Sequence, residues 1–126
     1  MKRDMDLVRE ILIALSEANE PINASVFTSD RFDYELVAYH FQIMDEAGLI
    51  EAKFLRADGN PYFSARAIRL TWQGNDFLSS ITSDTVWRKV KNVLSKIAAD
   101  VPLEVYKSTA TKLVSDMALQ QLNQII

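Results

Sequence analysis

The chain has 126 residues, of which 48% are hydrophobic and 25% charged, and a formal net charge of −3. This length suffices for a hydrophobic core without cross-links, and the balanced composition is not that of a disordered chain. The sequence contains no cysteine, which excludes disulfides, thiol nucleophiles and the common zinc sites and favours a cytoplasmic protein. No apolar run approaches the roughly 20 residues of a membrane-spanning helix, so we expect no membrane partner.

The charges are unevenly distributed along the sequence. Acidic residues outnumber basic ones between residues 4 and 48, whereas lysine and arginine outnumber acids between residues 49 and 99. A polyanion would therefore meet the second half of the chain first.

The first predicted helix covers Asp4–Ala18, where apolar residues recur at helical spacing and Asp4 or Asp6 can cap the start. The segment Ile22–Phe32 lacks this periodicity, which predicts an extended connection. Within it, Ala24–Thr28 is a candidate strand. The sequence leaves open whether a short helix hides in this segment.

The second predicted helix runs from Asp33 as its cap to Ala47, with Gly48 as the residue that ends it. Its spacing predicts a buried stripe of Leu36, Val37, His40, Phe41, Ile43, Met44 and Ala47. Its outward face is predicted to carry Glu35, Ala38, Tyr39, Gln42, Asp45 and Glu46. This face is acidic and contains no lysine or arginine.

A β-hairpin is predicted around the turn Asp58–Pro61. On the first strand Ile50, Ala52 and Phe54 alternate with Glu51, Lys53 and Leu55. On the return strand Ile68 and Leu70 are expected to alternate with Ala67 and Arg69.

Three helices are predicted after the hairpin. Thr71 caps a short one, Ser83 or Asp84 starts the next, and Asp100 and Pro102 mark the start of the last. The middle helix carries an apolar stripe of Trp87, Val90, Leu94 and Ile97, and both tryptophans, Trp72 and Trp87, are expected in the core. The apolar end of the chain, residues 122–126, is expected to pack on the core or on a second subunit.

The order helix, strand, turn, strand, helix is typical of a winged helix. We therefore predict one mostly α domain with a small β-hairpin, an α+β fold, over residues 1–126. Residues 1–81 would form a winged-helix-like core and residues 82–126 a C-terminal helical extension, through which we expect a homodimer.

Several motifs resemble one protein family over nearly the whole chain. They are Met1–Leu12, Val37–Phe41, Glu46–Ile50, Leu70–Gly74, Phe77–Leu78 and Asp84–Trp87. This bacterial and phage family is known as domain of unknown function 2513, and the resemblance implies no activity. Glu46–Leu49 and the leucine-threonine-x-x-glycine motif at Leu70–Gly74 also resemble winged-helix regulators of the arsenic-repressor and multidrug-repressor type.

The leading functional hypothesis is a noncatalytic, transcription-regulator-like nucleic-acid binder of bacterial or phage origin. Its candidate contacts are the basic residues of the hairpin and of the following helix, namely Lys53, Arg56, Arg66, Arg69, Lys89 and Lys91. The predicted helix 33–47 argues against the usual pose, because its acidic face would be repelled by the major groove. The alternative is a protein-interaction adaptor or inhibitor that uses Glu35, Tyr39, Gln42, Asp45 and Glu46 of that helix.

Catalysis is not expected. His40 is the single histidine, so one chain cannot build a histidine pair or a catalytic triad, and its place on the inward stripe predicts a packed structural side chain. Nothing resembles a phosphate-cradling loop. We therefore expect no catalytic residues, no metal site and no cofactor, while the DNA site, protein partner and pathway stay open.

Overall fold

A computed structural model describes residues 1–125 and divides the chain into two compact units, one of Met1–Leu78 and one that begins at Ser79. The boundary falls inside α3 (Trp72–Ile81). Residue 126, the last of the apolar tail considered above, lies outside the described residues.

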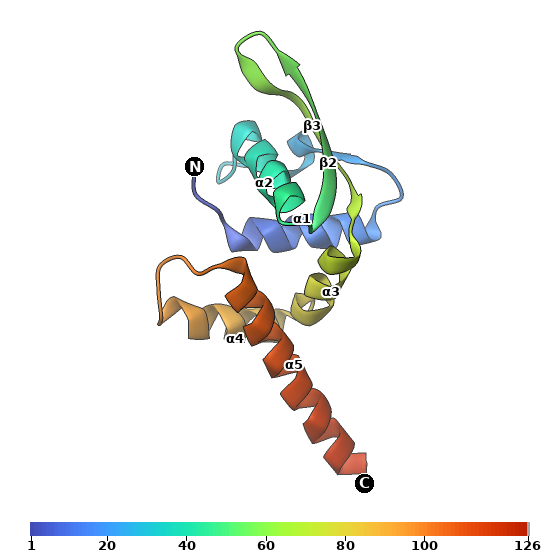
Figure 1. Cartoon of the computed structure of the whole chain (residues 1–126), viewed down its shortest axis with the longest axis vertical. Helices are drawn as coiled ribbons and strands as arrows, with labels where there is room; N and C mark the ends of the chain where they lie inside the picture. Colours follow the sequence, from blue (N-terminus) through green and yellow to red (C-terminus); the bar gives the residue numbers. More distant parts are fainter. Residues whose placement is uncertain (126) are drawn as a thin grey trace. The chain divides into compact units, whose positions relative to one another are not determined.

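The first unit combines helices with one antiparallel sheet whose strand order is β1-β3-β2. Its elements are α1 (Met5–Glu17), β1 (Ile22–Asn23), the 3₁₀ helix η1 (Ala24–Phe27), α2 (Tyr34–Glu46), β2 (Ile50–Ala57) and β3 (Asn60–Leu70). Figure 1 shows α1, α2 and the hairpin of β2 and β3. The predicted mostly helical α+β fold with a small hairpin is confirmed.

Of the two candidate caps of α1 the structure uses Asp4, and the predicted cap of α2, Asp33, is present. The Asp4 carboxylate accepts a hydrogen bond from the Leu7 N–H group (3.1 Å), and the Asp33 carboxylate accepts one from Leu36 N–H (2.8 Å). Such caps satisfy backbone donors that the first turn of a helix cannot satisfy itself. Behind the caps, α1 and α2 pack against each other and against β3, so their apolar stripes form the core.

The segment before α2 differs from the prediction. Residues 24–27 form η1 and not a strand, and β1 is limited to Ile22 and Asn23. The Asn23 side chain accepts a hydrogen bond from Ser25 N–H (2.9 Å) and so starts a helical turn where the apolar sequence favoured an extended chain. A short helix therefore does precede α2.

The buried surface of α2 is also wider than the single stripe predicted from its sequence. Ala38, expected to face outward, is fully buried, whereas Ala47, expected to face inward, is exposed. The reason is that η1 covers a further side of the helix, where the rings of Phe27 and Phe41 meet edge to face with centroids 5.9 Å apart. Ala47 is the C-cap residue and already lies at the end of the packed surface.

The hairpin has the predicted turn but a different register on β3. Glu51 pairs with Arg69 and Ala52 pairs with Ala67, which leaves Ile68 as the extra residue of a β-bulge. Ala65, Ala67 and Leu70 are the buried positions of β3, and the predicted alternation of Ile68 and Leu70 with Ala67 and Arg69 is broken at the bulge. A bulge depends on pairing with the other strand, so strict alternation along one strand could not reveal it.

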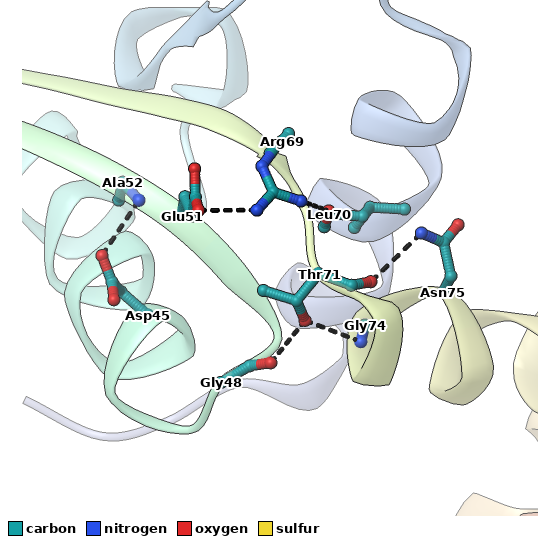
Figure 2. Close-up of polar contacts among 9 residues, drawn as sticks. All are labelled: Asp45, Gly48, Glu51, Ala52, Arg69, Leu70, Thr71, Gly74 and Asn75. Carbon is teal, nitrogen blue, oxygen red and sulfur yellow. Dashed lines mark hydrogen bonds and ion pairs between the residues drawn. The ribbon is translucent and has the colours of Figure 1, made fainter.

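The turn after α2 and the link from β3 to α3 form one hydrogen-bonded junction (Figure 2). Gly48 has a φ of +76°, the left-handed conformation of a helix-ending glycine. The Thr71 hydroxyl donates to the Gly48 carbonyl, and Thr71 N–H donates to the Leu49 carbonyl (3.0 Å). The same hydroxyl accepts a hydrogen bond from Gly74 N–H (3.0 Å), as predicted for a cap of α3.

Gly74 allows α3 to approach the Leu49 backbone closely. A Cβ atom at position 74 would lie 1.9 Å from the Leu49 carbonyl oxygen, which no side chain can tolerate. Trp72 lies two positions earlier on the helix and therefore points to its opposite side. Its side chain is 80% exposed, so the expectation that it belongs to the core is wrong.

The second unit contains α4 (Asp84–Ser95), capped by Ser83, and α5 (Leu103–Ile125). The buried Trp87 of α4 packs against Tyr106 of α5 with ring centroids 6.0 Å apart, and Ala110 is buried nearby in sequence. Ile97, predicted in the α4 stripe, is 71% exposed because the helix ends before it.

His40 joins the start of α1 to α2 and is fully buried. Its Nε2 atom accepts a hydrogen bond from Asp4 N–H, and its Nδ1–H group donates one to the Leu36 carbonyl. The donor–acceptor distance is 2.8 Å in each. Because a backbone amide only donates and a carbonyl only accepts, the ring is the neutral tautomer protonated at Nδ1. The predicted packed position of this histidine is confirmed.

Replacing Gly74 by alanine is expected to destabilise the protein by about 3 kcal/mol, because the new Cβ would collide with backbone. Gly48→Ala is the matched control. A Cβ there meets no atom within 4 Å, and only the left-handed φ is strained, at a cost of about 1 kcal/mol. Urea unfolding measures both free energies, and an equal or smaller loss for Gly74→Ala would contradict the close approach.

We expect the protein to become less stable as the pH falls, because His40 then becomes protonated. Burial lowers the pKa of this imidazole, outweighing the opposite effects of the Leu36 hydrogen bond and the Asp4 charge. Its contribution is therefore complete above the ordinary histidine pKa of about 6.5. It is lost as the pH falls from there to the lower folded-state pKa, by up to about 1.4 kcal/mol per pH unit.

The measurement is urea unfolding of the wild type and of His40→Gln between pH 7.5 and 5. Glutamine can keep an acceptor for Asp4 N–H but does not titrate, so its unfolding free energy should decline less with acidification. Parallel pH profiles for the two proteins would show that His40 is not the group responsible.

Candidate nucleic-acid interface

Three basic residues of the hairpin, Lys53, Arg66 and Arg69, lie on the sheet face opposite to that of the buried Ala65 and Ala67. Lys53 of β2 is the register partner of Arg66 on β3, and Arg66 is in turn the partner of Asn23 on β1. Directly opposed residues of neighbouring strands point to the same face. Asn23, Arg66 and Lys53 thus form one row across the three strands, which we call the basic row; its two cations are exposed.

The next row of the hairpin is electrically balanced. Arg69 and Glu51 are also register partners, and the guanidinium lies 2.7 Å from the carboxylate. Arg69 donates a second hydrogen bond to the Leu70 carbonyl (3.1 Å), as Figure 2 shows. Of the predicted contacts, Arg69 is therefore the one already engaged within the hairpin.

The far end of the hairpin extends past α2 (Figure 1). It exposes Arg56 together with two apolar side chains, Leu55 at 65% and Phe63 at 63%. These two side chains and Asn23 are not among the site residues predicted from the sequence. Strand alternation placed Leu55 on the face of Lys53 and was the available signal, whereas Asn23 required knowledge of which strand β1 joins.

The opposite side of the hairpin is fastened to α2. The Tyr62 hydroxyl donates to the Gln42 side-chain oxygen, and the Tyr34 hydroxyl accepts a hydrogen bond from Ala65 N–H (3.0 Å). The Asp45 carboxylate accepts one from Ala52 N–H (2.9 Å).

The predicted acidic face of α2 therefore divides into two parts. Gln42 and Asp45 hold the hairpin and are partly buried, and Tyr39 is partly buried as well. Glu35 and Glu46 are exposed. These two carboxylates are the acids that remain on the surface of this face.

Tyr62 reports the electrostatic character of this inner side. Its pKa is raised, first by burial and then by the nearby Tyr39, Glu35 and Glu46, while Arg56 acts in the opposite direction. Carboxylates and one guanidinium thus both act on the Tyr62 hydroxyl next to α2, and the basic row lies on the other face of the hairpin.

Lys89 and Lys91, the remaining predicted contacts, belong to the second unit. Two positions apart on α4, they do not share one helix face. Lys91 is partly buried with its ammonium 5.8 Å from the centre of the Trp87 ring, whereas Lys89 is exposed beside α5.

Within residues 1–125, no group of three or more histidine, cysteine, aspartate or glutamate side chains is placed to hold a metal ion. The described helices are also too short or too polar to cross a membrane.

Comparison with known proteins places this fold in one family. The model of the family described as "Hypothetical protein (DUF2513)" matches residues 2–100. A relative from Haemophilus influenzae, described as "Uncharacterized protein", is 39% identical over 120 residues, which cover 93% of this chain and 98% of the relative. No solved structure matches the chain.

The matched region includes the caps, the Gly48–Thr71–Gly74 junction and the whole hairpin. The resemblance noted from the sequence motifs is therefore confirmed. The chain belongs to the DUF2513 family.

Proposed function

We propose that the protein is a noncatalytic nucleic-acid-binding module of the winged-helix type that contacts the phosphate backbone through the outer face of its hairpin. The observation that carries the proposal is the basic row, in which Lys53 and Arg66 stand side by side and exposed. The order of α1, β1, η1, α2 and the hairpin, with β1 added beside β3, supports the winged-helix part of the proposal.

The chemistry of the basic row suits a phosphate. The Arg66 guanidinium offers a planar fork of donors, the Lys53 ammonium a point charge, and the Asn23 amide a further neutral donor. The row itself contains no carboxylate, and the Glu51 charge beside it is already paired with Arg69. A two-stranded ribbon of this kind also has the dimensions to enter a major groove.

The acidic surface of α2 determines the expected mode of binding. Glu35 and Glu46 are exposed on this helix, and seating it in a groove would bring both towards phosphates. We therefore propose that the hairpin and not α2 makes the contact. Binding of this kind reads the backbone more than the bases and depends strongly on salt.

The double variant Lys53→Glu/Arg66→Glu tests the proposal. Wild-type protein is expected to bind a mixed-sequence 20-base-pair duplex at micromolar concentration in low salt. The variant should bind at least roughly tenfold more weakly, with the salt slope reduced by about 2 because two phosphate contacts are lost. Fluorescence anisotropy at several salt concentrations measures both quantities, on duplex and on single-stranded DNA.

The control is Lys2→Glu/Lys96→Glu, which changes the net charge equally at exposed positions outside the hairpin. It should keep most of the affinity. Absence of wild-type binding in low salt, or equal losses in the two double variants, would refute binding through the basic row.

The alternative function, a protein adaptor or inhibitor, is favoured by the exposure of Glu35 and Glu46 on one helix. In that case Glu35→Lys/Glu46→Lys would abolish capture of a basic protein partner and leave DNA binding no weaker. Asp45 is unsuitable for this test, because its loss leaves Ala52 N–H without its acceptor.

Asp45→Ala is accordingly expected to lower the unfolding free energy by about 1 kcal/mol, and Glu46→Ala by less than about 0.5 kcal/mol. Urea unfolding distinguishes the two variants. Equal effects would mean that Asp45 is a surface acid like Glu46 and belongs with the alternative interface.

We further propose a cytoplasmic location and a role on a bacterial or phage genome. The absence of cysteine from the sequence supports the location. The expected homodimer concerns the helices of the second unit and is independent of the basic row.

A further inference from the structure

One face of α5 carries residues at alternating spacings of three and four. They are Val105, Thr109, Lys112, Asp116, Leu119 and Asn123. This spacing puts them in one line along a helix and is the spacing by which helices pair side by side. We call this line the α5 stripe.

The first part of the α5 stripe forms one wall of a groove against α4. Thr109, Lys112 and Asp116 line a groove of about 490 Å³ together with apolar residues. The apolar lining is Val90 and Val93 of α4 and Leu113 of α5. Val93 is 50% exposed, so the floor of this groove is open to a further side chain.

The second part of α5 runs on past α4 (Figure 1). From residue 117 to residue 125 it has no charged side chain, and Leu119 and Leu122 are 57% and 50% exposed. A solvated helix surface normally carries charges, and short helical segments without tertiary contacts are only marginally stable in water. The same chain thus supplies a groove with an apolar floor and an uncharged helix segment with exposed leucines.

We propose that two copies of this protein pair through their α5 stripes in antiparallel orientation. In that orientation Lys112 of each copy lies beside Asp116 of the other. The same register puts Thr109 beside Leu119 of the second copy, so that this leucine enters the groove between α4 and α5. Leu119 cannot enter the groove of its own chain, because it lies on α5, the helix that forms one wall of that groove.

Charge complementarity argues for a second copy of this chain as the occupant. Lys112 and Asp116 already pair within α5 (2.9 Å), and both are exposed at the groove edge. Reversing the direction of an identical helix exchanges their positions, so two copies meet cation to anion twice. A parallel pair would bring lysine to lysine and aspartate to aspartate.

The first test is sedimentation equilibrium of the full chain across a concentration series. We expect wild-type protein to approach twice its 14.3 kDa mass by a concentration on the order of 100 μM. Lys112→Asp should weaken dimerisation by roughly tenfold, because two aspartates of one copy then face two of the other.

The exchanged double variant Lys112→Asp/Asp116→Lys should restore wild-type dimerisation, since both the internal pair and the pairs between copies are rebuilt. Leu55→Glu, at an exposed apolar position of the hairpin, is the control and should leave the mass unchanged. A monomeric wild type, or a failure of the exchanged variant to recover, would overturn the proposal.

The second test uses the natural absence of cysteine. Thr109→Cys and Leu119→Cys, mixed and mildly oxidised, should form a disulfide between copies, and neither should do so alone. In the antiparallel register, residue 109 of one copy lies ten residues along the helix from residue 109 of the other, and the same holds for residue 119. This separation of about 15 Å exceeds the reach of a disulfide. Cross-linking of either variant alone would indicate parallel pairing and refute the register.

Discussion

The Leu49 carbonyl is the point on which the arrangement of the first unit depends. It accepts a hydrogen bond from Thr71 N–H. It also lies so close to the Cα atom of Gly74 that a Cβ atom there could not fit. One peptide group thus sets the end of α2, the base of the hairpin and the start of α3 relative to one another. Because the hairpin begins at Ile50, its direction is set at the same point.

The hairpin consequently has two sides of different character. Its inner side is held to α2 by hydrogen bonds that Gln42, Asp45 and Tyr34 make with β2 and β3. Polar side chains on α2 that resemble a binding surface in the sequence are in this way used inside the fold. The groups left for an external partner are the cations of the outer face and the carboxylates of Glu35 and Glu46.

Local signals predicted much of this fold, and contacts between distant segments account for what they missed. The helix caps, the helix end at Gly48 and the hairpin turn each depend on residues close in sequence, and the sequence predicts them correctly. The bulge at Ile68 and the burial of Ala38 depend on pairing and packing with other elements. The candidate site follows the same division: alternation predicted that Lys53 faces outward, but only the register shows that Arg66 stands beside it and that Arg69 is paired.

The shortness of β1 has a consequence for solubility. Among the described residues it pairs only with Ala67 and Arg66, so the outer part of β3 is a sheet edge, as β2 is along its length. Free edges invite strand addition and aggregation unless charges or proline interrupt them. Lys53 on the edge strand β2 and Pro61 in the outer part of β3 meet that need. The Lys53 charge thus disfavours strand addition at β2, an effect that a neutral replacement would remove.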